Sequence, residues 1–256
     1  MLPTPDTSHV PFNTVYEPAE DSYLFLDTLS SPAESAWLAT RFATTPAPLI
    51  TEVGCGSGVV LGFATANAQS IFGRRDVLAI GTDVNLHACL ATRETVQRAV
   101  QTQQKEEATS QQETTTSLYL DSLTADLCRP LRPGSVDVLL FNPPYVPTPD
   151  LPPIPSNDQT YGPSKPSFET ESYLLSLTYA GGADGMETTN RLLELVPDVL
   201  ADHGVAYVLL CAQNKPAQVR ESILAWPGEW QAEIVGRSGM QAGWEKLVIL
   251  RIWRST

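Results

Sequence analysis

The sequence predicts an α/β fold in which helices cover both sides of one mostly parallel, doubly wound sheet. Two observations support this prediction. Seven short apolar stretches, rich in β-branched residues, alternate with longer helix-like stretches along most of the 256 residues. The last two of these strands follow each other without a helix between them, which indicates an antiparallel pair that closes the sheet. Apolar residues make up 42% of the chain, which is enough for a full hydrophobic core.

The first half of the chain is expected to contain three strands and three helices. A helix begins in YEPAEDSYLFLDTL, where Pro18 suits the first helical position and nearby acidic residues favour the positive end of the helix dipole. The strand LITEV then leads through the turn GCGSG into the helix VVLGFATANAQSIFG, which ends at Gly73. The strand VLAIGTD, the helix NLHACLATRETVQRAV and the short strand SLYL follow in that order.

The second half is expected to contain four strands and two helices. The strand VDVLLF is followed, after a long loop, by the helix TTNRLLELVPDVLADHG, which Gly204 closes and Pro197 kinks. The strand VAYVLLC and the helix PAQVRESILAW come next. WQAEIVG and KLVILRIW then form the closing antiparallel pair, so we expect a seven-stranded sheet.

Two low-complexity stretches interrupt the pattern without dividing the chain. Residues 101–117, QTQQKEEATSQQETTTS, are rich in Gln and Thr and are expected to be a flexible insertion. Residues 146–170 are rich in proline and are expected to form a loop on the substrate side of the sheet. Because strands and helices continue on both sides of each stretch, we expect a single domain over residues 1–256, with residues 1–15 as an N-terminal extension.

Charge and cysteine content narrow the class of protein. The net charge of −13 argues against an autonomous nucleic-acid binder, whose surface is normally basic. Four scattered cysteines without a Cys-x-x-Cys pair argue against a disulfide framework or a metal site and favour buried thiols in a reducing compartment. The N-terminus has no signal-peptide pattern, and no stretch approaches the ~20 apolar residues of a membrane span. We therefore expect a protein that is cytoplasmic, or cytoplasmic and nuclear.

A glycine turn after the first strand predicts a ligand site. Gly54, Gly56 and Gly58 in TEVGCGSG allow the backbone to approach a ligand closely, where sheets of this kind bind nucleotide-like molecules. Val59 occupies the position of the third glycine in a dinucleotide-binding motif, so that motif is absent. Glu52 precedes the turn and suits a cationic ligand better than a pyrophosphate.

Acidic residues also stand at the ends of the next two strands. Asp83 ends VLAIGTD and can accept both hydroxyls of a ribose, although it could also cap the following helix. Asp126 could accept from an adenine amine, with Leu127 packed on the ring, although it could also cap a turn. Three acids at the carboxyl ends of successive strands indicate an adenosine that lacks phosphate and has a cationic tail. We therefore predict S-adenosylmethionine as the cofactor.

The motif Asn-Pro-Pro-Tyr ends the fourth strand. Pro143 and Pro144 have fixed φ and lack N–H donors, so they end the ladder and hold Asn142 at the mouth of the sheet. The side-chain oxygen of Asn142 and the carbonyl of Pro143 can accept the two N–H bonds of a planar amine. We predict Asn142, Pro143 and Tyr145 as catalytic residues, with Pro144 as a further substrate contact and Tyr145 stacked on the substrate. The structural alternative is a turn that is merely stiffened by proline.

Several motifs together resemble the eukaryotic and archaeal HemK-type glutamine methyltransferases, over nearly the whole chain. The motifs are YEPAEDS, EVGCGSGVV, GTDVN, TADL, FNPPYVPTP, YAGGADGMETTNRLLELVPDVL and SGMQAGWEKLVILR. The resemblance implies a Rossmann-like class I S-adenosylmethionine-dependent fold. It also implies a substrate, the glutamine of the Gly-Gly-Gln motif in the class 1 translation release factor. The donor contacts that it implies are Asp21, Ser22, Glu52, Gly54, Asp83, Asp126, Leu127 and Asn142. The 101–117 insertion and the long proline-rich loop depart from the family pattern.

Other substrates present similar chemistry. An exocyclic adenine amine of DNA or RNA has the same planar NH₂ group as a glutamine amide. The chain has no Lys or Arg before Arg41 and none between Arg132 and Lys165, whereas a flipped base would bring phosphates that need cations nearby. A lysine ammonium is not a planar amine, so it cannot bind the oxygens of Asn142 and Pro143 in the same way. A catalytically silent donor-binding scaffold would not need an intact NPPY motif.

The third strand is expected to lie at one edge of the sheet. Leu118, Tyr119 and Leu120 carry no Lys, Arg or Pro to protect such an edge from other chains. Either the preceding insertion covers the edge or another chain binds it. The resemblance implies a small zinc-ribbon methyltransferase activator as that partner, in a heterodimer whose zinc belongs to the activator.

Overall fold

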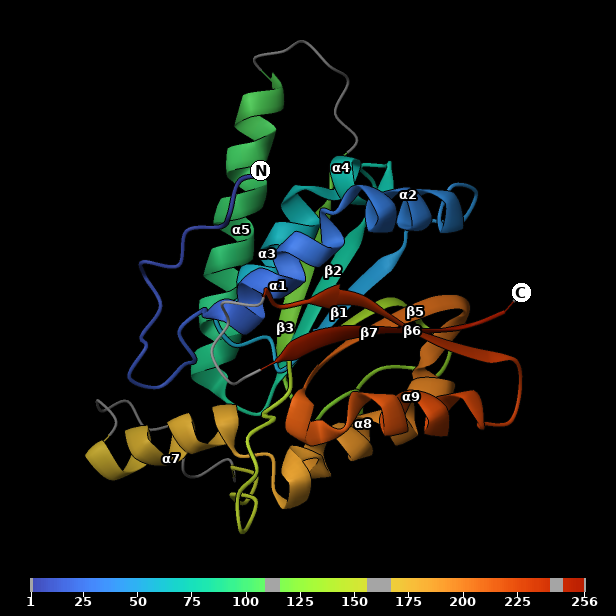
Figure 1. The fold of residues 1–256 in the computed structure, drawn as a ribbon. Helices are drawn as coiled ribbons and strands as arrows, with labels where there is room; N and C mark the ends of the chain where they lie inside the picture. The colour runs from blue at the N-terminus through green and yellow to red at the C-terminus, as the bar shows by residue number, and fades with distance from the viewer. Residues whose placement is uncertain (1, 109–115, 156–166, 240–245, 256) are drawn as a thin grey trace.

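The computed structural model describes residues 2–108, 116–155, 167–239 and 246–255, which form one sheet with helices on both faces (Figure 1). The strands of the sheet are β1 (Leu49–Val53), β2 (Leu78–Asp83), β3 (Leu118–Thr124), β4 (Val136–Phe141), β5 (Leu200–Cys211), β6 (Trp230–Arg237) and β7 (Leu247–Arg254). The helices are α1 (Glu20–Leu29), α2 (Pro32–Arg41), α3 (Val59–Ala66), α4 (Ala68–Phe72), α5 (Leu86–Ala108), α7 (Phe168–Tyr179), α8 (Glu187–Val199) and α9 (Pro216–Leu224). Two 3₁₀ turns are η1 (Ala183–Gly185) and η2 (Ala212–Asn214).

The strand order confirms the predicted sheet. The seven strands lie in the order β3-β2-β1-β4-β5-β7-β6. All neighbours from β3 to β5 are parallel, whereas β7 is antiparallel to both β5 and β6. Val53 of β1 is level with Thr82 of β2 and with Phe141 of β4. The residues that follow these three strands therefore emerge at one edge of the sheet, where such folds bind ligands.

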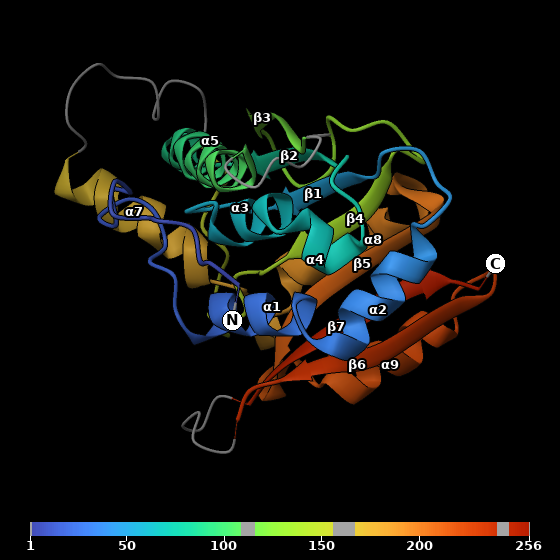
Figure 2. The ribbon, with the colours of Figure 1, turned by 90° about the horizontal axis from the view of Figure 1, so that it is seen from above.

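Two hydrophobic layers hold the helices on the sheet. Alternate residues of a strand face opposite sides, and β4 shows this directly. Val138 and Leu140 belong to the core under α1–α5, whereas Leu139 and Phe141 belong to the core under α8 and α9. Figure 2 shows the same two groups of helices on either side of the sheet. Both faces of the central strands are consequently buried, as their continuous apolar sequences require.

Several helix boundaries differ from the sequence prediction. The first helix begins at Glu20, so Pro18 lies outside it. The helix predicted to run to Gly73 is divided at Asn67 into α3 and α4, although Gly73 does end the second piece. Helix α8 contains Pro197 but ends at Val199 instead of at Gly204. Its end is earlier because the next residue, Leu200, already pairs with Val136 of β4, so Gly204 lies within β5.

Two helices were not predicted, and one extends further than expected. Helix α2 begins after Ser31, whose hydroxyl accepts the N–H of Glu34 at 3.3 Å, a common N-cap. Helix α7 begins at Phe168, inside the predicted 146–170 loop. Helix α5 continues to Ala108, so the first part of the 101–117 insertion is helical. Residues 109–115 and 156–166 of these two predicted stretches lie outside the described residues.

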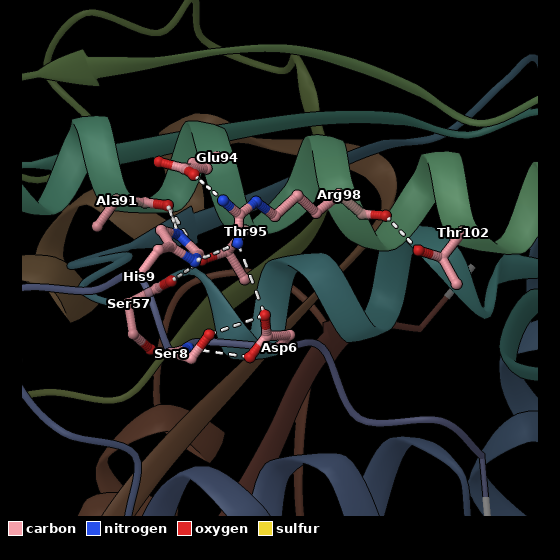
Figure 3. Close-up of polar contacts among 9 residues, drawn as sticks. All are labelled: Asp6, Ser8, His9, Ser57, Ala91, Glu94, Thr95, Arg98 and Thr102. Carbon is pink, nitrogen blue, oxygen red and sulfur yellow. Dashed lines mark hydrogen bonds and ion pairs between the residues drawn. The ribbon is translucent and has the colours of Figure 1, made fainter.

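The N-terminal extension lies along α5 (Figure 3). The imidazole Nε2 of His9 is 3.2 Å from the hydroxyl of Thr95, and the Arg98 guanidinium is 3.6 Å from the carboxylate of Asp6. Further along, the carbonyl of Thr14 accepts a hydrogen bond of 2.7 Å from the side chain of Asn85. The last of these contacts brings the end of the extension to the edge of the sheet where β2 ends.

All four cysteines are buried as free thiols. Within the described ranges, no group of His, Cys, Asp and Glu side chains is arranged to hold a metal ion. None of the described helices combines the length and the apolar character that a bilayer crossing requires.

Candidate active site

A cavity of about 1240 Å³, counted with the solvent at its mouth, lies at the carboxyl ends of β1, β2 and β4. The N-terminal extension, α7 and the start of α8 complete its walls. It brings together most of the residues that the sequence predicted for donor and substrate. These are Asp21, Ser22, Glu52, Gly54, Gly56, Asp83, Asp126, Leu127, Asn142, Pro143 and Pro144.

The glycine turn is attached to β2 through its backbone. The N–H of Gly54 donates to the carbonyl of Thr82 at 2.7 Å, and the N–H of Gly56 donates to the Asp83 carboxylate at 3.0 Å. The turn and the acid at the end of β2 are therefore one unit. The order of strand, turn and helix in the sequence was enough to predict that the turn and Asp83 lie together.

Asp83 is held by backbone donors but still faces the cavity. Its Oδ1 accepts the N–H of Asn85 at 2.8 Å, just before α5, so it also has the capping role considered from the sequence. The side chain is partly exposed to the cavity and enclosed by protein elsewhere. This desolvation raises the pKa of Asp83 to about 6, although the backbone N–H groups of Asn85, Gly56 and Val84 oppose the rise. At neutral pH the group is mainly a carboxylate that can accept further hydrogen bonds.

Glu52 is a buried carboxylate at the floor of the cavity. Its Oε2 accepts the N–H of Leu61 in α3 at 2.8 Å. Burial raises the pKa of Glu52 well above its usual range. Among the described residues, no Lys or Arg forms an ion pair with it. A cationic group in the cavity would therefore stabilise the charged form of Glu52.

Asp21 enters the cavity from the first turn of α1. Its carboxylate accepts the N–H of Ser22 at 2.6 Å and the hydroxyl of Tyr16 at 3.0 Å. Tyr16 belongs to the segment between the N-terminal extension and α1, and it also lines the cavity. The sequence did not single out Tyr16, because nothing in its local pattern shows that it will meet Asp21.

Asp126 forms ion pairs that were not predicted. Its Oδ2 lies 2.5 Å from a guanidinium nitrogen of Arg191 in α8 and 3.2 Å from Nε of Arg129. Arg191 lines the cavity and is the only Lys or Arg among its described lining residues. With Asp21, Glu52, Asp83 and Asp126 in the same walls, the cavity is predominantly acidic. Such a wall favours a cationic ligand.

Asn142 follows β4 and has an unusual buried oxygen. Its Oδ1 is buried and has no hydrogen-bond partner among the described residues. Buried acceptors without a partner are rare, because each one loses its hydration without compensation. An N–H donor in the cavity would satisfy this oxygen.

Two predicted site residues do not line the cavity. Gly58 precedes α3, and a Cβ there would lie 2.6 Å from Cα of Thr92, so glycine allows α3 and α5 to pack closely. The ring of Tyr145 packs against the core under α1–α5, and its carbonyl accepts a hydrogen bond from Asn214. The stacking of Tyr145 on the substrate stays a prediction. The chain turns inward after Pro144, which the proline content alone did not indicate.

The chain is similar to proteins that are named as methyltransferases. It is 32% identical to the "eRF1 methyltransferase catalytic subunit mtq2" of Schizosaccharomyces pombe, over 99% of this chain and 96% of that protein. It is 31% identical to the "Methyltransferase HEMK2" of Homo sapiens, over 98% of this chain and 97% of that protein. A solved ribosomal protein L11 methylase from Lactobacillus delbrueckii subsp. bulgaricus has a TM-score of 0.48 and 12% identity, over 94% and 82% of the two chains. No family model matches the chain.

Proposed function

The chain belongs to the methyltransferase family of mtq2 and HEMK2, and we propose on that basis that it methylates a glutamine of a translation release factor. The acceptor is the side-chain amide nitrogen of the glutamine in the Gly-Gly-Gln motif of the eukaryotic class 1 factor. The methyl donor is S-adenosylmethionine. The observation that supports the acceptor chemistry best is the buried Oδ1 of Asn142, which has no partner among the described residues.

The walls of the cavity fit this donor. Asp83 presents a carboxylate that can accept the two ribose hydroxyls. Asp21 offers negative charge for the cationic tail, Glu52 would become charged beside that tail, and Leu127 offers an apolar surface for the adenine ring. The Oδ2 of Asp126 is engaged by Arg191, so its other oxygen is the one that would accept from the adenine amine. When bound, S-adenosylmethionine supplies an electrophilic methyl group on a cationic sulfur.

Asn142 and Pro143 would position the acceptor. An amide nitrogen is a poor nucleophile because its lone pair is conjugated with the carbonyl group. The Oδ1 of Asn142 and the carbonyl oxygen of Pro143 can accept its two N–H bonds and hold the nitrogen toward the donor. As the nitrogen forms its new bond, positive charge develops on it, so both hydrogen bonds strengthen in the transition state. Most of the rate enhancement would come from this positioning.

We also propose that a small zinc-ribbon activator protein binds the free edge of β3. This strand is first in the sheet order and pairs with β2 on its other side. Leu118 and Leu120 are 54% and 48% exposed, and Leu90 of α5 is 48% exposed. Tyr119 points inward, where its hydroxyl contacts that of Ser122 at 2.6 Å. No described strand pairs with this outer edge of β3. An apolar edge of this kind suits a partner that adds a strand.

A direct test offers the protein, co-expressed and purified with the activator, two acceptors with labelled donor. One acceptor is a release-factor domain that contains the Gly-Gly-Gln motif, and the other is an adenine-containing DNA duplex. We expect label in the domain only, and no label when its glutamine is replaced by alanine. Label in the duplex alone would reverse the proposal in favour of an adenine amine.

A further inference from the structure

A buried asparagine that does not itself line the cavity holds the backbone that follows Asn142. Asn214 ends η2, directly after β5, and is 2% exposed. Its Oδ1 accepts the N–H of Cys211 at 2.8 Å. Its Nδ2 donates toward three carbonyls, those of Asp184 at 2.9 Å, Tyr145 at 3.2 Å and Gly185 at 3.3 Å. One side chain thus joins β5, the η1 turn and the end of the Asn-Pro-Pro-Tyr motif.

Backbone hydrogen bonds continue this attachment beyond Tyr145. The N–H of Val146 donates to the carbonyl of Tyr179 at 3.0 Å, and the N–H of Gly181 donates to the carbonyl of Val146 at 2.8 Å. The N–H of Thr148 donates to the carbonyl of Gly182 at 3.0 Å. The chain leaving Pro144 is therefore fastened to the segment between α7 and η1 (Figure 1).

Gly185 makes this close approach sterically possible. Its φ is +68°, and a Cβ at this position would overlap the carbonyl oxygen of Tyr145 and lie 2.8 Å from Nδ2 of Asn214. Any larger residue would push Tyr145 or Asn214 away. This contact gives a physical reason for the last glycine of the GGADG sequence. The sequence alone predicted no role for that glycine.

Proline rigidity alone does not orient the acceptor site. The rings of Pro143 and Pro144 fix φ, and Pro144 also confines ψ of Pro143 to the extended region, a range of about 40°. A change of ψ within this range still turns the Pro143 carbonyl that would grip the amide. The hydrogen bond from Asn214 to the carbonyl of Tyr145 fixes the backbone two residues after Pro143 and so restrains that rotation. A displacement of about 1 Å at a reacting group can reduce the rate on the order of 100-fold.

We propose that Asn214 is a positioning residue for methyl transfer, acting through the carbonyl of Tyr145 on Asn142 and Pro143. The proposal rests on the function proposed above for Asn142. Asn214 is absent from the residues that line the cavity, so the role proposed for it is indirect. Its effect should therefore fall on the rate of transfer and leave donor binding intact.

The test compares Asn214→Ala with a buried asparagine elsewhere. Asn67 is 5% exposed, and its Nδ2 donates to the carbonyls of Phe63 at 2.9 Å and Pro3 at 3.3 Å, away from the cavity. Asn67→Ala should lower stability to a similar extent and leave kcat near the wild-type value. Asn214→Ala should lower kcat on the release-factor domain by about 10- to 100-fold, with KM and donor affinity within about threefold of wild type. Asn214→Ser, which keeps a hydroxyl donor, is a milder variant that should fold and have an intermediate kcat.

Donor calorimetry on the same preparation separates positioning from general loss of structure. A folded Asn214→Ala that binds S-adenosylmethionine normally and has a lowered kcat is the result that the positioning role predicts. A wild-type kcat in folded Asn214→Ala and Asn214→Ser would overturn the positioning role and leave the proposed function intact. A wild-type protein that does not methylate the domain, even when it is co-purified with the activator, would overturn the proposed function, and the positioning role with it.

Discussion

Asp83 and Gly56 are joined by a hydrogen bond of 3.0 Å between a carboxylate oxygen and a backbone N–H. The bond connects the end of β2 to the glycine turn after β1, so the acid is placed by the same backbone that approaches the ligand. The other oxygen accepts from Asn85. Both oxygens are thus oriented before any ligand binds, which reduces the cost of ordering the site.

Replacement of Asp83 by alanine should weaken donor binding. The loss of charged hydrogen bonds to the ribose is expected to cost about 1.5–3 kcal/mol, because hydrogen bonds to ionised groups are the stronger class. Titration calorimetry with S-adenosylmethionine measures the change, and circular dichroism verifies the fold. Asp27→Ala, at an exposed aspartate of α1, is the matched control and should bind normally. An unchanged affinity in folded Asp83→Ala would contradict the ribose assignment.

Donor binding should also depend on pH through Asp83. Burial raises the pKa of Asp83 to about 6 in the free protein, and the ribose hydroxyls need the ionised form as acceptor. Affinity should be full above pH 6 and should fall, by up to about tenfold per pH unit, as the pH drops below it. Calorimetry from pH 5 to pH 8 tests this dependence. In Asp83→Asn the contribution of this group should vanish, and a profile identical to that of wild type would assign the titration to another group.

Replacement of Asn142 by alanine should abolish methyl transfer and leave the binding of S-adenosylmethionine intact. The grip on the amide N–H bonds strengthens as the transition state forms, so its loss lowers kcat more than it changes binding. Single-turnover transfer and donor calorimetry on the same preparation separate the two effects. Asn190→Ala, at an exposed asparagine of α8, should be active. Near-normal turnover in Asn142→Ala would show that the mechanism is wrong.

The positions that the sequence predicted are those set by the order of strands, turns and helices along the chain. The order of strand, glycine turn and helix placed Gly54, Gly56 and Asp83 correctly, because each contact joins residues at the ends of adjacent strands. Arg191 was missed because its partner Asp126 is 65 residues away, and no local pattern marks either side of such a pair. The inward turn of Tyr145 likewise depends on Asn214, 69 residues further along the chain.

Helix α2 was missed for the same reason. Its ten residues are short and mixed in polarity, so they have no clear apolar period. What holds the helix is a buried ion pair, in which Arg251 of β7 donates to both oxygens of Glu34 at 2.8 Å and 2.9 Å. Tyr207 of β5 also donates to Glu34, and the Arg251 guanidinium lies 4.0 Å from the ring centroid of Trp37. Cation–π contacts of this kind add to the attachment.

Removal of Glu34 should destabilise the fold strongly. Glu34→Ala leaves the charge of Arg251 buried with one partner fewer, which typically costs about 3–5 kcal/mol. Urea denaturation followed by circular dichroism measures the free energy of unfolding. Arg251 has a second partner, Glu233, which is 59% exposed, and Glu233→Gln should cost less than about 1 kcal/mol. Equal effects of the two substitutions would contradict the structural role given to the buried pair.

The edge of β3 should become protected when the activator binds. The protein alone should be poorly soluble or inactive, and co-expression with the zinc-ribbon activator should restore it. Hydrogen exchange followed by mass spectrometry should slow at Leu118–Leu120 in the complex. The opposite edge strand, β6, should exchange equally in both states. Unchanged exchange at Leu118–Leu120 would place the interface elsewhere, and full activity of a stable, partner-free protein would contradict the need for an activator.

The central claim is that the Asn142 site transfers a methyl group to a glutamine amide. Tandem mass spectrometry of a release-factor domain, after incubation with S-adenosylmethionine and the protein co-purified with its activator, locates the added mass on a single residue. We predict one methyl group on the side-chain nitrogen of the glutamine in Gly-Gly-Gln, and none after incubation with Asn142→Ala. A methyl group on a lysine, or an unmodified glutamine beside a methylated adenine in a competing duplex, would contradict the account.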